Sequence, residues 1–167
     1  MKRVLFQSLT TQLLFYAPCP VLIVPLAALI QWERIILAVN GSHSIEPALS
    51  EALKIAKEYG SHVTAAIAPR RGGPAAVKEA SHQLKTSAEQ AGVPLETVLL
   101  PVHAMDELCR LAKEQDADII ITTQPDESIL KHIIHGSFSE QIIDRSLCSV
   151  LVIPGARDGV RTKRTIS

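Results

Sequence analysis

The sequence contains little cysteine, few aromatic residues and no excess of charge of either sign. The three cysteines, Cys19, Cys109 and Cys148, are widely spaced and form no C-x-x-C motif, so we predict reduced core thiols in a cytoplasmic protein. Seventeen basic and seventeen acidic residues cancel, which argues against nucleic acid as a partner. The single tryptophan, Trp32, is expected to pack against the domain rather than to recognise a ligand.

The chain also lacks an uninterrupted apolar run of about 20 residues, the length that a membrane span needs. The first residues, MKR, precede a largely apolar stretch that extends to Ile30 and imitates a signal peptide or a span. Pro18, Pro20 and Pro25 interrupt this stretch, and no small-x-small cleavage site precedes Gln31. We therefore expect neither secretion nor contact with a membrane.

An internal repeat is the most informative feature that is present. Met1–Pro25 aligns without a gap with Leu130–Pro154, at an offset of 129 residues. Seven positions are identical in the two copies, and in the first copy they are Lys2, Ser8, Gln12, Cys19, Val21, Leu22 and Pro25. Such self-similarity is typical of tandem architecture. A chain of 167 residues has room for one substantial core, so we interpret the first copy as an appendage to a single domain.

This interpretation divides the chain into four parts. Residues 1–25 are the remnant of a preceding domain, namely its last helix and strand, and residues 26–33 are a linker. Residues 34–154 form a whole domain, and residues 155–167 form a flexible basic tail.

Strand and helix patterns alternate through the predicted domain. Apolar runs predict strands at Arg34–Asn40, His62–Ala68, Leu95–Leu100, Ala117–Thr122 and Val150–Ile153. Helical periodicity predicts helices at Ile45–Tyr59, Ala75–Ala91, Met105–Ala112 and Ile133–Ser146. The first helix has Ser44 as a possible N-cap and Gly60 as a stop signal. Right-handed crossovers between such units give an α/β fold, a doubly wound, five-stranded parallel sheet with helices on both faces.

Two segments at the ends of this pattern resemble the universal stress protein family. IILAVNGSHSIEPAL is similar to that family's first strand and turn, and HGSFSEQIIDRSLCSVLVIP to its closing helix and strand. Tyr16–Pro25 (YAPCPVLIVP) resembles the same final strand. The resemblance, over about Ile35–Pro154, implies a Rossmann-like sheet of the adenine nucleotide alpha hydrolase type, with strand order 3-2-1-4-5. A crevice is then expected at the carboxyl ends of its first and fourth strands.

The resemblance also implies where a nucleotide would bind and why the site is degenerate. Family members that hold ATP use the pattern G-x2-G-x9-G-S/T after the fourth strand, and only Gly136-Ser137 remains of it. Thr123 and Asp126 replace the first two glycines, and Asn40 replaces an acid that holds the nucleoside. We therefore predict no bound cofactor. If ATP or AMP does bind, the expected site residues are Asn40, Gly41, Arg71, Thr123, Gly136 and Ser137.

Other candidate chemistry finds less support. The loop Arg70-Arg71-Gly72-Gly73 fits an anion site or an ordinary surface loop. His132 and His135 have the spacing of a metal pair without a third ligand nearby. The serines at 42, 44, 137 and 139 lie in no G-x-S-x-G turn. We predict no catalytic residue and no metal site.

The expected function is protein association in stress adaptation. Alternatives are an ATP- or AMP-binding sensor of the same fold and a regulatory domain of a larger transporter or signalling protein. Dimers of the family commonly pair through their last strands, so we expect the N-terminal strand to lie antiparallel beside the last strand of the domain. Association with a protein partner or a second copy would use Val21, Leu22, Ile23 and Val24 together with Val150, Leu151, Val152 and Ile153.

Overall fold

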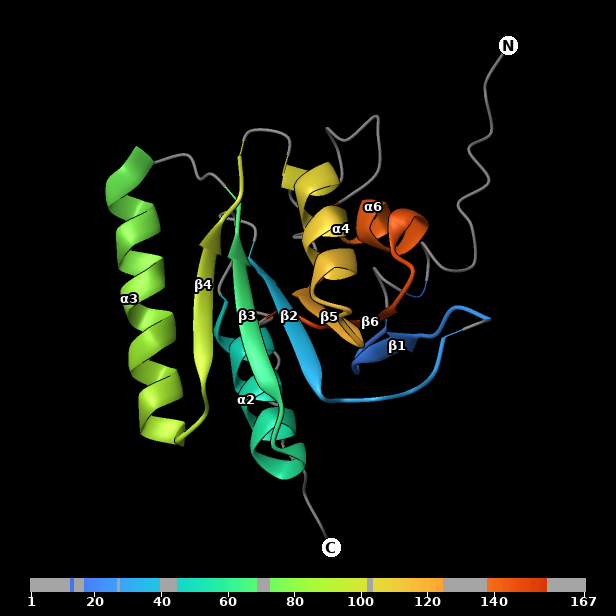
Figure 1. Ribbon diagram of the computed structural model, residues 1–167, viewed down its shortest axis with the longest axis horizontal. Coiled ribbons are helices and arrows are strands. Elements are labelled where there is room, and N and C mark those ends of the chain that lie inside the picture. Colours follow the sequence, from blue (N-terminus) through green and yellow to red (C-terminus); the bar gives the residue numbers. More distant parts are fainter. Residues whose placement is uncertain are drawn as a thin grey trace, which may run out of the picture.

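The computed structural model describes Leu13 and residues 17–26, 28–39, 45–68, 73–101, 104–124 and 138–155. Its six strands form one mixed sheet (Figure 1), and they are β1 (Val21–Ile23), β2 (Arg34–Val39), β3 (His62–Ile67), β4 (Leu95–Leu99), β5 (Ile119–Thr123) and β6 (Ser149–Ile153). The helices described in full are α2 (Glu46–Tyr59), α3 (Gly73–Ala91), α4 (Ala104–Glu114) and α6 (Phe138–Arg145). None of these four helices has the length and apolar character needed to cross a bilayer.

The sheet has the strand order β1-β6-β5-β2-β3-β4. The five strands from β2 to β6 are parallel, and counted from β2 along the chain they lie in the order third, second, first, fourth, fifth. The remaining strand, β1, pairs antiparallel with β6. The antiparallel pairing predicted for the N-terminal strand is therefore confirmed, and it makes the sheet mixed and six-stranded.

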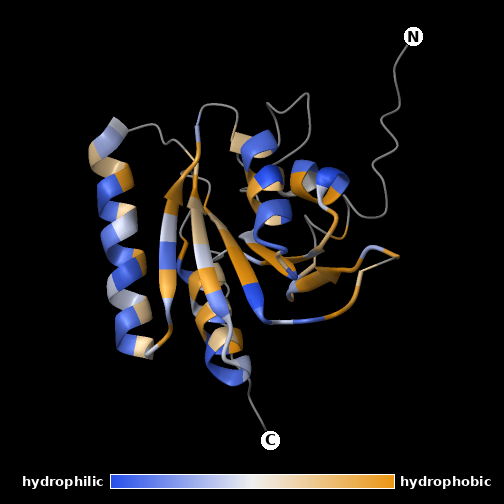
Figure 2. Cartoon of the chain, in the orientation of Figure 1, coloured by the Kyte–Doolittle hydropathy of each residue, from blue (hydrophilic) through white to orange (hydrophobic). Residues whose placement is uncertain are grey.

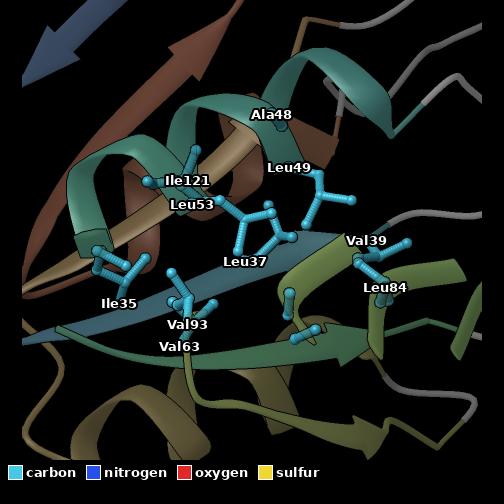
Figure 3. Packing of buried hydrophobic residues seen from close by; sticks show 14 of the residues in the cluster. Ile35, Leu37, Val39, Ala48, Leu49, Leu53, Val63, Leu84, Val93 and Ile121 are labelled. Atoms are coloured by element: carbon cyan, nitrogen blue, oxygen red, sulfur yellow. The ribbon is translucent and has the colours of Figure 1, made fainter. Parts of the chain in front are cut away.

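Both faces of the sheet are buried because its strands alternate between two apolar clusters. Ile35 and Leu37 of β2 point to the face covered by α2 and α3, the cluster drawn in Figure 3. Ile36 of the same strand points to the opposite cluster, beneath α4 and α6. Each of these fully buried side chains contributes roughly 1.5–3 kcal/mol to folding. Figure 2 shows the resulting hydrophobic colour along the strands. The predicted doubly wound arrangement is confirmed.

Helix α2 follows the predicted signals, with a proline in its first turn and a glycine at its end. It ends at Gly60, whose left-handed φ of 69° suits a residue without Cβ and whose N–H donates to the carbonyl oxygen of Ala56. At its start the N-cap position falls on Ile45, whose side chain makes no capping hydrogen bond. Ser44, the predicted N-cap, lies outside the described residues. Pro47 in the first turn presets a helical φ, as the sequence predicts.

The linker before β2 is fixed at the amino edge of the sheet. One carboxylate oxygen of Asp118 accepts the backbone N–H groups of Glu33 at 2.9 Å and of Arg34 at 2.8 Å. Trp32 stacks on Tyr59 with ring centroids 5.9 Å apart, so its predicted packing against the domain is confirmed. These contacts order the amino edge of the sheet.

Candidate functional site

The order of the sheet reverses at β2, which places the candidate site. Strands β2 and β5 are neighbours, and the chain passes from β2 to β3 on one side and from β5 to β6 on the other side. Helix α2 packs on one face and α4 on the other. Ligands of open α/β sheets bind in the crevice that this reversal opens at the carboxyl ends of the strands. Here those ends are Val39 of β2 and Thr123 of β5.

Three consecutive polar residues form the end of β5 in this crevice: Thr122, Thr123 and Gln124. Thr122 is buried, and its hydroxyl donates to the carbonyl oxygen of Ala38 in β2 at 3.4 Å. Thr123 is half-buried and is paired with Ile153 of β6 in the ladder. The described polar groups at the end of β5 are therefore hydroxyls and an amide, and those of Thr122 and Gln124 are buried and donate to backbone carbonyls of the protein itself.

Gln124 connects the crevice with the N-terminal segment. Its side chain is 7% exposed, and its backbone N–H donates to the carbonyl oxygen of Ile153 at 2.7 Å. Its side-chain Nε2 donates to the carbonyl oxygen of Ala17 at 3.2 Å. The segment that leads into β1 is thus held by the residue that directly precedes Pro125. Sequence reasoning identified Thr123 but missed Thr122 and Gln124, although the polar run TTQ after an apolar strand was a usable signal.

The five predicted site residues other than Thr123 are not among the residues that the structure describes. Asn40, Gly41, Arg71, Gly136 and Ser137 lie outside the described residues. The histidine pair His132 and His135, considered as metal ligands, also lies outside them. Within the described ranges, no group of three or more His, Cys, Asp or Glu side chains is arranged to hold a metal ion.

The cysteines differ from the prediction in one case. All three are unpaired, but Cys19 is exposed, whereas Cys109 and Cys148 are half-buried. Cys148 packs against the cluster beneath α4 and α6, while its repeat equivalent Cys19 precedes a strand at the margin of the sheet. The prediction of a core thiol at Cys19 is therefore wrong. Burial raises the pKa of both Cys109 and Cys148, which keeps these thiols protonated at neutral pH.

Comparison with known proteins assigns this fold to a family. Residues 31–154 match the universal stress protein family. The chain belongs to this family. Universal stress protein MJ0531 of Methanocaldococcus jannaschii is 28% identical over 139 residues, which cover 73% of this chain and 82% of that protein. The resemblance identified from the two end segments is thus confirmed at the level of the family.

Solved structures of universal stress proteins share the fold. One from Archaeoglobus fulgidus superposes with a TM-score of 0.67 at 18% identity, covering 84% of this chain and 51% of the other. One from Arabidopsis thaliana with AMP bound superposes with a TM-score of 0.57 at 13% identity. The superposition covers 81% of this chain and 99% of the other. At these identities the likeness concerns the fold alone.

Proposed function

We propose that this universal stress protein domain acts in the cytoplasm, without catalysis, through protein association at the β6 edge of its sheet. We also propose that Met1–Pro25 is the end of a second, truncated copy of the domain. The register of the β1–β6 pairing carries this proposal.

The register relates the two strands as copies of one element. In the ladder Leu22 is paired with Leu151, Val21 with Val152, and Ile23 with Val150. In the repeat the offset of 129 makes Leu22 the equivalent of Leu151, since 22 + 129 = 151. The central pair therefore joins two equivalent residues. Because Val21 corresponds to Val150 and Ile23 to Val152 in the repeat, each flanking pair is converted into the other when the two copies are exchanged. This is the local symmetry of an isologous twofold contact.

A strand paired in this way occupies the place that the last strand of a second copy would take. The chain thereby covers the β6 edge, which would otherwise present unpaired N–H and C=O groups to other chains. Figure 2 shows hydrophobic colour along β1, consistent with a strand that evolved to pack rather than to face water. Association of this domain thus depends on whether β1 or another strand pairs with β6.

The test removes β1 from the edge while retaining the whole chain. Ile23 is half-buried against the cluster beneath α4 and α6, so Ile23→Asp should release β1 from β6. We expect the unchanged protein to be monomeric and the variant to form a dimer, as measured by size-exclusion chromatography with light scattering. Leu26→Asp is the matched control because Leu26 is fully exposed in the linker.

Two outcomes would contradict the proposal. An Ile23→Asp variant that stays monomeric and keeps the stability of the unchanged protein would show that β1 does not cover an association edge. Dimerisation of the Leu26→Asp control to the same extent would show that the effect does not depend on β1. Circular dichroism of both variants establishes that the domain remains folded.

A second candidate function is that of an AMP or ATP sensor. The same fold holds AMP in the Arabidopsis thaliana protein, and the order of this sheet reverses where nucleotides bind in such folds. Binding would use Thr123 together with Asn40, Gly41, Arg71 and Gly136-Ser137. Isothermal titration with AMP and ATP, with and without magnesium, tests it. Saturable binding near micromolar concentration that Gly136→Val abolishes would favour the sensor, and no heat up to millimolar nucleotide would favour a degenerate site.

A further inference from the structure

Residues of α3 and β4 line a groove of about 640 Å³. These two elements lie at the end of the sheet opposite β1 (Figure 1). Val77 of α3 and Leu99 of β4 are apolar side chains of its lining. Leu99 is 61% exposed although it is a large apolar side chain in a strand. Neither the proposed nucleotide crevice nor the β6 edge includes these residues.

The ionisable side chains that line this groove are lysines and a histidine. Helix α3 contributes Lys78, His82 and Lys85 on one side, beside Ser81. No acidic side chain is among the lining residues, and neither lysine forms an ion pair within the described part of the chain. The acid nearest in β4, Glu96, points to the opposite face, because Thr97 hydrogen-bonds Ser81 of α3 and side chains alternate along a strand.

Strand β4 lies at the edge of the described sheet, next to the groove, and half of its backbone groups are available to pair with a further strand. Among the described strands β4 pairs only with β3. The carbonyl of Pro94 accepts the N–H of Val63 at 3.3 Å, and the N–H of Leu100 donates to the carbonyl of Ile67 at 2.8 Å, so the even-numbered residues of this strand direct their backbone groups to β3. The odd-numbered residues of β4 therefore turn their N–H and C=O groups outward, and these residues are Leu95, Thr97 and Leu99.

We propose that this edge binds an extended acidic peptide, which adds to β4 as a further strand and places acidic side chains beside Lys78, His82 and Lys85. Strand addition supplies affinity through the backbone, and the adjoining groove supplies specificity. The spacing fits this occupant: alternate side chains of a strand are about 6.7 Å apart. Lys78 and His82 are separated by about 6 Å along the helix axis.

The experiment uses the full-length protein and the fluorescein-labelled peptide TEVEVET, measured by fluorescence anisotropy at low salt. We expect saturable binding to this peptide and none to TKVKVKT. Two exposed ion pairs would be lost in Lys78→Gln/Lys85→Gln, so the affinity should fall roughly two- to thirtyfold. The charge-matched control Lys57→Gln/Lys113→Gln, which alters lysines outside the groove, should change it by less than about twofold.

Two N-methylated peptides separate strand addition from simple charge attraction. Only one of the two alternating sets of peptide amides faces β4, so methylation of the glutamate amides and of the valine amides should have unequal effects. One methylated peptide should lose binding and the other should keep it. Equal binding by both would show that the groove attracts acidic molecules without strand addition and would overturn the proposal, as would an absence of binding to TEVEVET.

Discussion

Replacing Gln124 with alanine tests whether the end of β5 holds the N-terminal segment in place. The substitution removes the amide that donates to the carbonyl of Ala17 at 3.2 Å. It keeps the backbone N–H that donates to Ile153 at 2.7 Å, so the ladder between β5 and β6 is unchanged. The perturbation therefore separates the side-chain contact with the N-terminal segment from the pairing of the sheet.

The expected size follows from what Gln124 loses. A neutral hydrogen bond contributes about 1 kcal/mol, and the loss of one buried methylene costs about 0.8 kcal/mol. The free energy of unfolding should thus fall by about 1–2 kcal/mol. Only the hydrogen bond concerns the segment before β1, and about 1 kcal/mol corresponds to a roughly fivefold change in an opening equilibrium. Amides of Val21–Ile23 should exchange roughly fivefold faster.

Urea denaturation measures the global effect, and hydrogen exchange with mass spectrometry measures the local one. Gln83→Ala is the matched control, because Gln83 makes an exposed hydrogen bond to Glu46 far from β1. It should leave the exchange of Val21–Ile23 unchanged. If Gln124→Ala lowers the stability by the expected amount but exchange in β1 stays within twofold of the unchanged protein, Gln124 only fills space and the reasoning is refuted.

Two further predictions concern the helix end and the thiols. Gly60→Ala places a side chain at a φ of 69° with no atom within 4 Å, so the backbone alone should cost about 1–2 kcal/mol and lower Tm by about 2–8 °C in calorimetry, whereas Gly155→Ala should have no effect. Ellman's reagent should modify the exposed Cys19 first, and Cys19→Ser should remove that fast phase while Cys109 and Cys148 stay slow. Because burial raises the pKa of these two thiols above the unfolded value, their contribution to stability is present at neutral pH and should be lost as the pH rises through the raised folded-state values.

The sequence predicted the elements because their signals are local. The apolar run of β2 and the spacing of Ala48, Leu49 and Ala52 in α2 require no knowledge of neighbouring elements. The core thiol at Cys19 was predicted wrongly. The outcome depended on tertiary context, because the segment before β1 lies at the margin of the sheet and leaves this thiol exposed.

The candidate site could be predicted only in part. Thr123 was found through the family pattern, but Gln124 acquires its role from Ala17, which is 107 residues away in the chain. The basic groove beside β4 likewise joins side chains of a helix and a strand that no sequence motif connects.

The sequence by itself determined the alternation of strands and helices, the internal repeat and the family, because periodicity and self-similarity are written along the chain. Only the tertiary structure decided that Leu22 is paired with its own repeat equivalent, Leu151, and that Gln124 fastens the segment before β1. Within the described part of the chain, it also decided that β4 is a strand at the edge of the sheet that pairs with β3 alone. Register, edge exposure and hydrogen bonds between distant residues follow from how elements pack, and packing depends on many residues at once.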